Sequence, residues 1–239
     1  MVKQWKVTIP QLSGEAERLV YVYLPEDYMT SGKRYPVLYM FDGHNVFFDT
    51  DATYGKSWGM KDYLDRTPHD LIIVGIECGH DGEERLSEYL PYAASKSTHF
   101  AKFEPKGDET MQWILSEVKP LIDLEYRTIP FRECTGIGGS SMGGIMSLYA
   151  AVHYNRWFSK AACVSSAMGF CMGPLMADMA ANVMDPDTRV YLSWGTREAH
   201  GIKDPNKSLK DQNMDVAEGA DPITVFDFYM NQTEDYVTR

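Results

Sequence analysis

The spacing of hydrophobic and polar residues changes along the chain. Apolar residues alternate with polar ones over residues 5–9, and the segment RLVYVYL (18–24) follows after a short break that contains a glycine. This two-residue period predicts a pair of antiparallel strands. The apolar runs then become continuous, as in YPVLYMF (35–41) and LIIVGI (71–76). Continuous runs are typical of parallel strands that are buried on both faces.

Segments with helical spacing lie between the apolar runs. Residues 109–123 place five apolar side chains on one predicted face: Met111, Ile114, Leu115, Val118 and Leu121. Residues 142–153 have the same spacing, and further strands are predicted at 161–165, 190–194 and 223–229. Strands that alternate with helices predict an α/β class, with a mostly parallel central sheet flanked by helices. We expect one domain over residues 1–239, with residues 203–221 as a polar connection.

Composition and charge narrow the classes of partner. The 239 residues are 44% hydrophobic, which suits one large core, and the formal net charge is −11. This negative charge disfavours nucleic acid and anionic membranes as partners and favours a small-molecule or neutral carbohydrate substrate. No apolar run reaches the roughly 18 to 20 residues of a membrane helix, and the N-terminus reads as a strand and not as a signal peptide. We therefore expect a cytoplasmic protein without a membrane partner, and homo-oligomerisation stays open.

The cysteines and acidic residues do not indicate a cofactor. The chain has four cysteines, far apart and in no C-x-x-C arrangement: Cys78, Cys134, Cys163 and Cys171. We interpret them as buried thiols. Asp49 and Asp51 form a short acidic pair that lacks further oxygen ligands and reads as a solvated turn. No metal and no cofactor are expected.

The sequence GGSSMGG (138–144) carries the chemistry. A G-x-S-x-G pentapeptide by itself is weak evidence, but here it follows an apolar strand and opens an amphipathic helix. That context is the one required for a nucleophile elbow, a tight turn in which the residues around the serine must be very small. We therefore predict that Ser141 is the nucleophile of a serine hydrolase.

The same arrangement predicts two donors for an oxyanion hole. The first peptide N–H of the predicted helix belongs to Met142 and should face the negative charge that develops on an attacked carbonyl. A second donor is expected from the loop after the strand 35–41, and we assign the backbone N–H of His44 to it.

Five segments in order resemble a known family: YPVLYMFDGHNVF, YGKSWGM, RLSEYLPY, GGSSMGG and YLSWGTREA. Over residues 18–205 they are similar to the esterase D-like "putative esterase" family of α/β-hydrolases, which includes feruloyl and acetyl xylan esterases, enterobactin-type esterases, S-formylglutathione hydrolases and mycolyltransferases. The resemblance implies an α/β-hydrolase fold and hydrolysis of carboxylic esters, including acyl groups on carbohydrates. It also implies Ser141 as nucleophile, His44 and Met142 as oxyanion donors, and Glu198 as the acid that orients the catalytic histidine. Glu198 follows a buried strand, where open α/β sheets gather their sites.

The catalytic histidine is missing from its expected place. In this fold the base follows the nucleophile and the acid, yet no histidine follows His200, and the chain departs from the family pattern after about residue 205. His200 lies too close to Glu198 in sequence to be oriented by it easily, and the imidazole of His44 is the other substitute. His69, His80, His99 and His153 are set aside as residues of loops or helix ends. Three interpretations remain: a C-terminal part that is altered or incomplete, a pseudoenzyme that keeps a binding pocket, or a base from elsewhere.

Two groups of apolar side chains follow the predicted catalytic segments. Aromatic residues come after the oxyanion loop: Phe41, Phe47, Phe48, Tyr54 and Trp58. Methionines come after the strand 161–165: Met168, Met172, Met176 and Met179. Each group suits either an acyl pocket or ordinary core packing.

Overall fold

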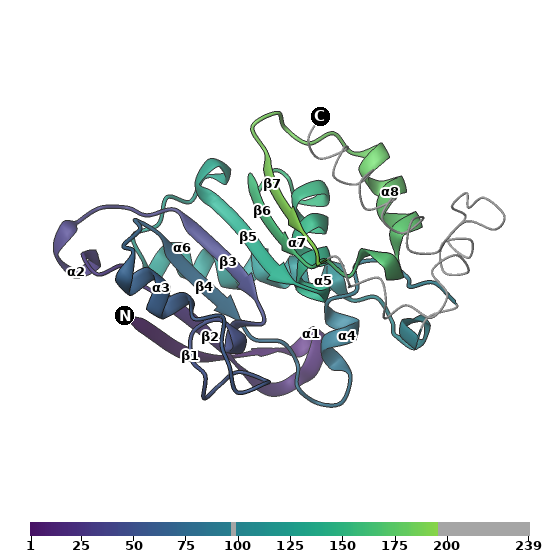
Figure 1. Ribbon diagram of the computed structural model, residues 1–239, viewed down its shortest axis with the longest axis horizontal. Helices are drawn as coiled ribbons and strands as arrows, with labels where there is room; N and C mark the ends of the chain where they lie inside the picture. The colour runs from purple at the N-terminus through teal and green to yellow at the C-terminus, as the bar shows by residue number, and fades with distance from the viewer. Residues whose placement is uncertain (97–98, 196–239) are drawn as a thin grey trace.

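A central sheet organises the computed structural model, which describes residues 1–96 and 99–195. Its strands are β1 (Val2–Ile9), β2 (Gly14–Tyr23), β3 (Val37–Phe41), β4 (Ile72–Ile76), β5 (Thr135–Ser140), β6 (Lys160–Val164) and β7 (Arg189–Ser193). The seven strands of this part of the chain have the order β1-β2-β4-β3-β5-β6-β7, so β1 and β7 form the two edges (Figure 1). The strands from β3 to β7 are parallel to one another, whereas β2 is antiparallel to both β1 and β4.

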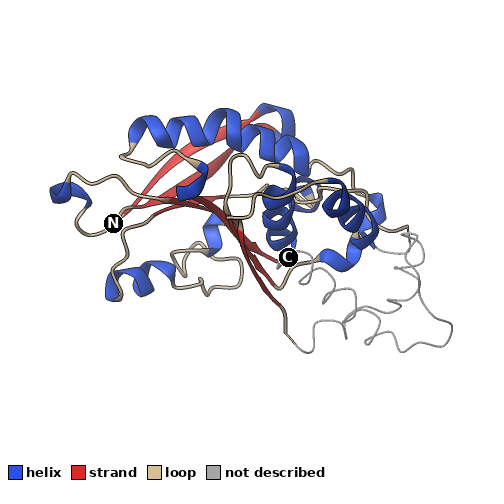
Figure 2. Ribbon diagram, turned by 90° about the horizontal axis from the view of Figure 1, so that it is seen from above, coloured by secondary structure: helices blue, strands red, loops and turns tan. Residues whose placement is uncertain are grey.

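Helices cover both faces of the sheet (Figure 2). They are α1 (Pro10–Ser13), α2 (Tyr28–Ser31), α3 (Met60–Arg66), α4 (Glu84–Glu88), α5 (Gly107–Trp113), α6 (Lys119–Glu125), α7 (Met142–His153) and α8 (Met172–Ala181). Short 3-10 turns are η1 (Gly43–Asn45), η2 (His99–Lys102), η4 (Arg132–Cys134) and η5 (Met168–Phe170), and η3 (Ile114–Val118) is a π turn. The expected α/β class, with a mostly parallel sheet flanked by helices, is confirmed.

The core lies in two layers because successive strand residues point to opposite faces. In β2, Val20 and Val22 belong to the larger cluster, which also contains the inner faces of α5 and α7. Tyr21 and Tyr23 belong to the smaller cluster, which includes Leu64 of α3. The antiparallel pair of β1 and β2 and the buried parallel strands therefore lie where the two apolar periods predict them. The predicted strand 223–229 and the connection 203–221 lie outside the described residues, and the prediction of one domain stays a prediction.

The helix predicted over residues 109–123 contains a π turn, which changes the side chains that face the core. Residues 107–125 continue from α5 to α6 through the π turn η3. A π turn holds one residue more than an α turn, so the residues after it are rotated around the helix axis. Ile122 is therefore fully buried, whereas Leu121, which was predicted on the inner face, is 38% exposed.

The parallel strands all end at the same edge of the sheet, called the carboxyl edge below. The loops after β3, β4, β5 and β6 therefore meet there, and β3 lies between β4 and β5. Ligands of open α/β sheets bind at this edge.

A helix that crosses a bilayer needs about 20 predominantly apolar residues. Within residues 1–96 and 99–195, no helix is both long enough and apolar enough for that.

Candidate active site

Ser141 occupies a strained turn between β5 and α7. Its backbone angles are φ 55° and ψ −117°, and it is the residue that caps the N-terminus of α7. Positive φ is rare for a residue with a side chain and typically costs about 1–3 kcal/mol. Hydrogen bonds hold the turn: the N–H of Ser141 donates to Val164 O at 3.0 Å, and its carbonyl accepts from the N–H groups of Gly144 and Ala167, each at 3.0 Å. The side chain is exposed at the carboxyl edge.

Glycines make this turn possible. A Cβ atom added to Gly139 would lie 2.7 Å from the carbonyl carbon of Gly143, so strand and helix touch backbone to backbone. One added to Gly143 would lie 3.0 Å from Cβ of Phe41, and one added to Gly144 would lie 2.7 Å from Oγ of Ser166. The strand, sharp turn and helix predicted from GGSSMGG are present, and Met142 is the first residue of α7.

The loop after β3 lies next to this turn. Asp42 adopts the left-handed conformation with φ 56°, and η1 (Gly43–Asn45) follows. A Cβ atom on Gly43 would be 2.4 Å from the carbonyl carbon of Gly75 in β4, so the loop rests directly on the neighbouring strand. His44 is buried in η1, in the loop that was predicted to supply the second oxyanion donor.

An ion pair between the buried carboxylate of Asp42 and the partly exposed side chain of Arg85 holds this loop from the other side. The guanidinium of Arg85 donates from Nε to Oδ1 of Asp42 at 2.6 Å and from Nη2 to Oδ2 at 2.8 Å. The N–H of Asp42 donates to the hydroxyl of Tyr89 at 3.1 Å. Two-point pairing of this kind sets geometry as well as charge. The loop after β3 is therefore held by α4 and the residue that follows it.

The imidazole of His44 meets a second histidine. Nε2 of His44 is 3.0 Å from Oγ1 of Thr53, and burial lowers the pKa of His44 below its ordinary value. The ring of His80 packs edge-on against it, with 4.7 Å between the ring centroids, and Nε2 of His80 is 2.9 Å from Oε1 of Glu77. The loop after β4 therefore brings His80, which was set aside from the sequence as a loop residue, to the carboxyl edge beside His44.

The other histidines lie elsewhere or outside the description. His69 precedes β4, at the opposite edge of the sheet, where it stacks on Tyr63. His153 ends α7, the helix that Ser141 begins, and at about 1.5 Å per residue the twelve helical positions separate the two by nearly 20 Å. His200 and the side chain of His99 lie outside the described residues. Glu198 lies outside them as well, five residues beyond the end of β7 at Ser193.

Sequence reasoning missed the pair of Asp42 and Arg85. Both residues stand in segments that carried the family resemblance, but neither received a role. A signal was available, because Asp42 directly follows a buried parallel strand and such positions gather at one edge. The partner 43 positions later has no local signature.

Most of the candidate pocket residues belong to the core. Phe41, Phe47 and three of the methionines, Met168, Met172 and Met179, are buried in the two core clusters. Tyr54 is 92% exposed and Trp58 is 39% exposed. Ordinary packing therefore accounts for the buried members of both groups.

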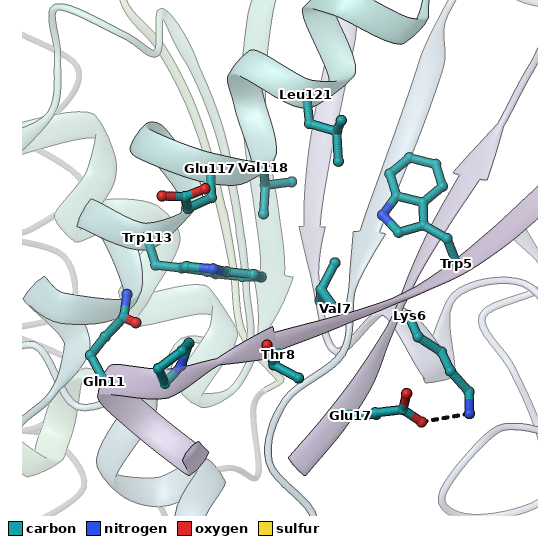
Figure 3. Close-up of a pocket in the computed structure, with 11 residues that line it drawn as sticks. Trp5, Lys6, Val7, Thr8, Gln11, Glu17, Trp113, Glu117, Val118 and Leu121 are labelled. Atoms are coloured by element: carbon teal, nitrogen blue, oxygen red, sulfur yellow. Dashed lines mark hydrogen bonds and ion pairs between the residues drawn. The ribbon is translucent and has the colours of Figure 1, made fainter. Parts of the chain in front are cut away.

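An open groove of about 680 Å³ lies away from this edge (Figure 3). Trp5 and Val7 of β1 line one side, and Trp113, Val118 and Leu121 of the helix 107–125 line the other. Its lining residues include no serine, cysteine or histidine. The groove offers no nucleophile, so chemistry and not volume locates the candidate site.

Comparisons with known proteins agree on one family. Residues 13–219 match the family model described as "Putative esterase". The chain is 28% identical to the uncharacterized protein YbbA of Bacillus subtilis over 179 residues. The matched segment covers 74% of this chain and 67% of YbbA. The chain is 33% identical to Esterase Rv1288 of Mycobacterium tuberculosis over 141 residues. That segment covers 59% of this chain and only 27% of Rv1288.

A solved structure supports the fold. The siderophore hydrolase EstA from Aspergillus nidulans superposes with a TM-score of 0.64 at 17% sequence identity, over 89% of this chain and 78% of EstA. At this identity the likeness shows the α/β-hydrolase-type fold alone.

Proposed function

The chain belongs to this esterase family, and from that premise we propose that it hydrolyses carboxylic esters with Ser141 as the nucleophile. The observation that carries the proposal is the backbone of Ser141, which has φ 55° at the junction of β5 and α7. Strain of this kind persists at functional sites, where it exposes one side chain to a reacting group.

The proposed reaction proceeds through an acyl-enzyme. Oγ of Ser141 attacks the ester carbonyl, and its proton passes to a base. The backbone N–H groups of Met142 and His44 stabilise the oxyanion, each by a few kcal/mol. The C–O bond to the alcohol then breaks, and the alcohol leaves with a proton from the same base. Water attacks the acyl-enzyme in the same manner, which releases the acid and restores the serine.

The base is the open part of this mechanism. Glu198 is proposed to orient a histidine, and His44 and His200 are the two candidates within this sequence. With neither in the family position, we expect slow turnover, because loss of one essential member of a serine triad typically costs on the order of 10⁴ to 10⁶ in rate.

The substrate class follows from charge and from the names of similar proteins. The net charge of −11 disfavours polyanions. EstA is named as a siderophore hydrolase and Rv1288 as an esterase. We propose a small-molecule ester or an acylated carbohydrate.

A binding protein that keeps the fold is the second candidate. The observation that favours it is the absence of any histidine between residues 201 and 239 of the sequence. Such a protein would retain ester affinity but would not activate Ser141.

The two candidates differ in the reactivity of Ser141 toward a fluorophosphonate probe. The esterase labels once per chain, and Ser141→Ala abolishes labelling, whereas the neighbouring Ser140→Ala keeps it. Absence of labelling in the wild-type chain, or equal labelling of Ser141→Ala, would refute the nucleophile and favour the binding protein.

Hydrolysis of 4-nitrophenyl acetate identifies the base. If no histidine serves, Glu198→Gln changes the residual rate by less than about threefold, because triad residues act as a unit. Fast wild-type turnover that is lost in Ser141→Ala and in one of His44→Ala or His200→Ala would overturn the missing-base interpretation and name the base.

A further inference from the structure

Three metal-binding side chains converge at the carboxyl edge. His44 comes from the loop after β3, and Cys78 and His80 come from the loop after β4. Each offers one donor atom, and these three atoms all lie within 4.8 Å of one another. Imidazole nitrogen and thiolate sulfur are the donors that Zn²⁺ prefers.

A second, independent feature points to a ligand. His44 is 4% exposed, and its Nδ1 atom has no hydrogen-bond partner among the described residues. A buried polar atom without a partner is rare in native proteins, and each case calls for an explanation such as an ion. The edge-on contact with the ring of His80 accounts for the proximity of the two rings, but it leaves this nitrogen unpaired.

The remaining nitrogen of each ring is already oriented. Nε2 of His44 pairs with the hydroxyl of Thr53 at 3.0 Å, and Nε2 of His80 pairs with the carboxylate of Glu77 at 2.9 Å. Metal-binding histidines characteristically pair their other nitrogen with a carboxylate, a carbonyl or a hydrogen-bonding group of this kind. The nitrogen that these bonds leave over is Nδ1 in both rings.

We propose that Nδ1 of His44, Sγ of Cys78 and Nδ1 of His80 bind a zinc ion, with solvent as the fourth ligand. Donor atoms around tetrahedral Zn²⁺ are about 3.3–3.5 Å apart, as follows from Zn–N distances of about 2.0 Å and Zn–S distances of about 2.3 Å. The three donors therefore need to approach by about 1 Å. His80 can supply this movement because 55% of its side chain is exposed.

The loop that carries Cys78 and His80 has a fixed backbone and an entry path. The carboxylate of Glu88 accepts a hydrogen bond from the N–H of Gly79 at 3.0 Å and is itself paired with the buried guanidinium of Arg18. A cavity of about 240 Å³ is lined by Cys78, Gly79 and His80 and opens toward solvent.

The surroundings suit a cation. Asp81 and Glu84 line the same cavity, and the carboxylate of Glu77 lies 2.9 Å from Nε2 of His80. On binding, the S–H bond of Cys78 is replaced by a Zn–S bond and the thiol proton is released to solvent. Zinc would occupy the imidazole of His44, so zinc binding and service of this ring as the catalytic base are alternatives. The test below measures metal binding and does not depend on turnover.

The test is a titration of the full, metal-free, reduced chain with Zn²⁺ in competition with a chromophoric chelator. We expect one Zn²⁺ per chain, and at least tenfold weaker binding in His80→Ala and in Cys78→Ala. With Co²⁺ as the probe, visible ligand-field bands and a thiolate-to-cobalt charge-transfer band should appear, and the charge-transfer band should be lost in Cys78→Ala.

Matched controls come from the same chain. Cys134→Ala and His69→Ala remove a free cysteine and an exposed histidine away from the cluster and should bind Zn²⁺ as the wild type does. His80→Ala removes an exposed side chain, so it keeps the test decisive if the buried Cys78→Ala fails to fold. Absence of stoichiometric binding by the wild type, or unchanged binding in His80→Ala, would overturn the proposal, as would a folded Cys78→Ala that keeps full affinity.

Discussion

Replacement of Ser141 by glycine should stabilise the fold relative to replacement by alanine. Both variants lose the hydroxyl, but only alanine keeps the Cβ atom at φ 55° and ψ −117°. Relief of this strain contributes about 1–3 kcal/mol, and the greater freedom of glycine in the unfolded chain removes about 0.4–1 kcal/mol of that gain. The net difference in the free energy of unfolding should therefore be about 1 kcal/mol in favour of Ser141→Gly.

Urea denaturation measures this difference directly. With a dependence of about 2 kcal/mol per molar urea, 1 kcal/mol moves the midpoint by about 0.5 M. Ser87 in α4 is the matched control. There the conformation is helical, so glycine should be about 1 kcal/mol less stable than alanine, the opposite sign.

The comparison also has a clear negative outcome. If Ser141→Gly is no more stable than Ser141→Ala, while the Ser87 pair shows its expected difference, then the turn at Ser141 is not strained and the argument from backbone geometry fails. Neither variant needs a working catalytic base, so the result is independent of turnover.

Three other substitutions test the segment between β3 and α3 and its contacts. Gly43→Ala should force the loop after β3 away from β4, because the added Cβ atom would lie 2.4 Å from the backbone of Gly75. We expect the free energy of unfolding to fall by about 1–3 kcal/mol and the rate of fluorophosphonate labelling to fall on the order of 10²-fold. The control Gly136→Ala, whose added atom would lie 3.3 Å from the nearest side chain, should change both much less. Arg85→Met should cost about 3 kcal/mol in urea denaturation because it strands the carboxylate of Asp42, and Arg85→Met combined with Asp42→Asn should recover part of this loss. Hydrogen bonds from the backbone N–H of Ser57 and the side chains of Lys56 and Ser57 lower the pKa of Asp49 to about 2, so its contribution to stability is complete above the ordinary pKa near 4 and is lost as the pH falls through 2. Asp49→Asn should be less stable than wild type at pH 7, and the unfolding curves should converge only below about pH 2.

The sharp turn at Ser141 could be predicted because its causes are local. The glycines, the apolar strand before Ser141 and the helix after it stand within twenty residues, and the turn admits few other sequences. The parallel strands could also be predicted from the sequence, because burial on both faces requires continuous apolar runs.

The contacts that hold the loop after β3 could not be predicted from local sequence patterns. Asp42 pairs with Arg85, and His44 meets His80, only because β3 and β4 are neighbours in the sheet. Strand order is a property of the whole chain and leaves no period in the sequence. Leu121 shows the same limit on a smaller scale, because a single π turn rotates the residues that follow it around the helix axis and leaves Ile122, not Leu121, facing the core.

The π turn at Ile114–Val118 also marks the position in this helix where one residue can be lost without misdirecting the buried side chains. A π turn behaves as one extra residue placed inside an α-helix, with the flanking turns keeping their orientation. Loss of one residue within 114–118 would leave a continuous helix with Ile122 still directed to the core, whereas loss of one residue elsewhere in 107–125 would rotate one half of the helix by about 100° against the sheet. Relatives of different length should therefore gain or lose their residue at this turn.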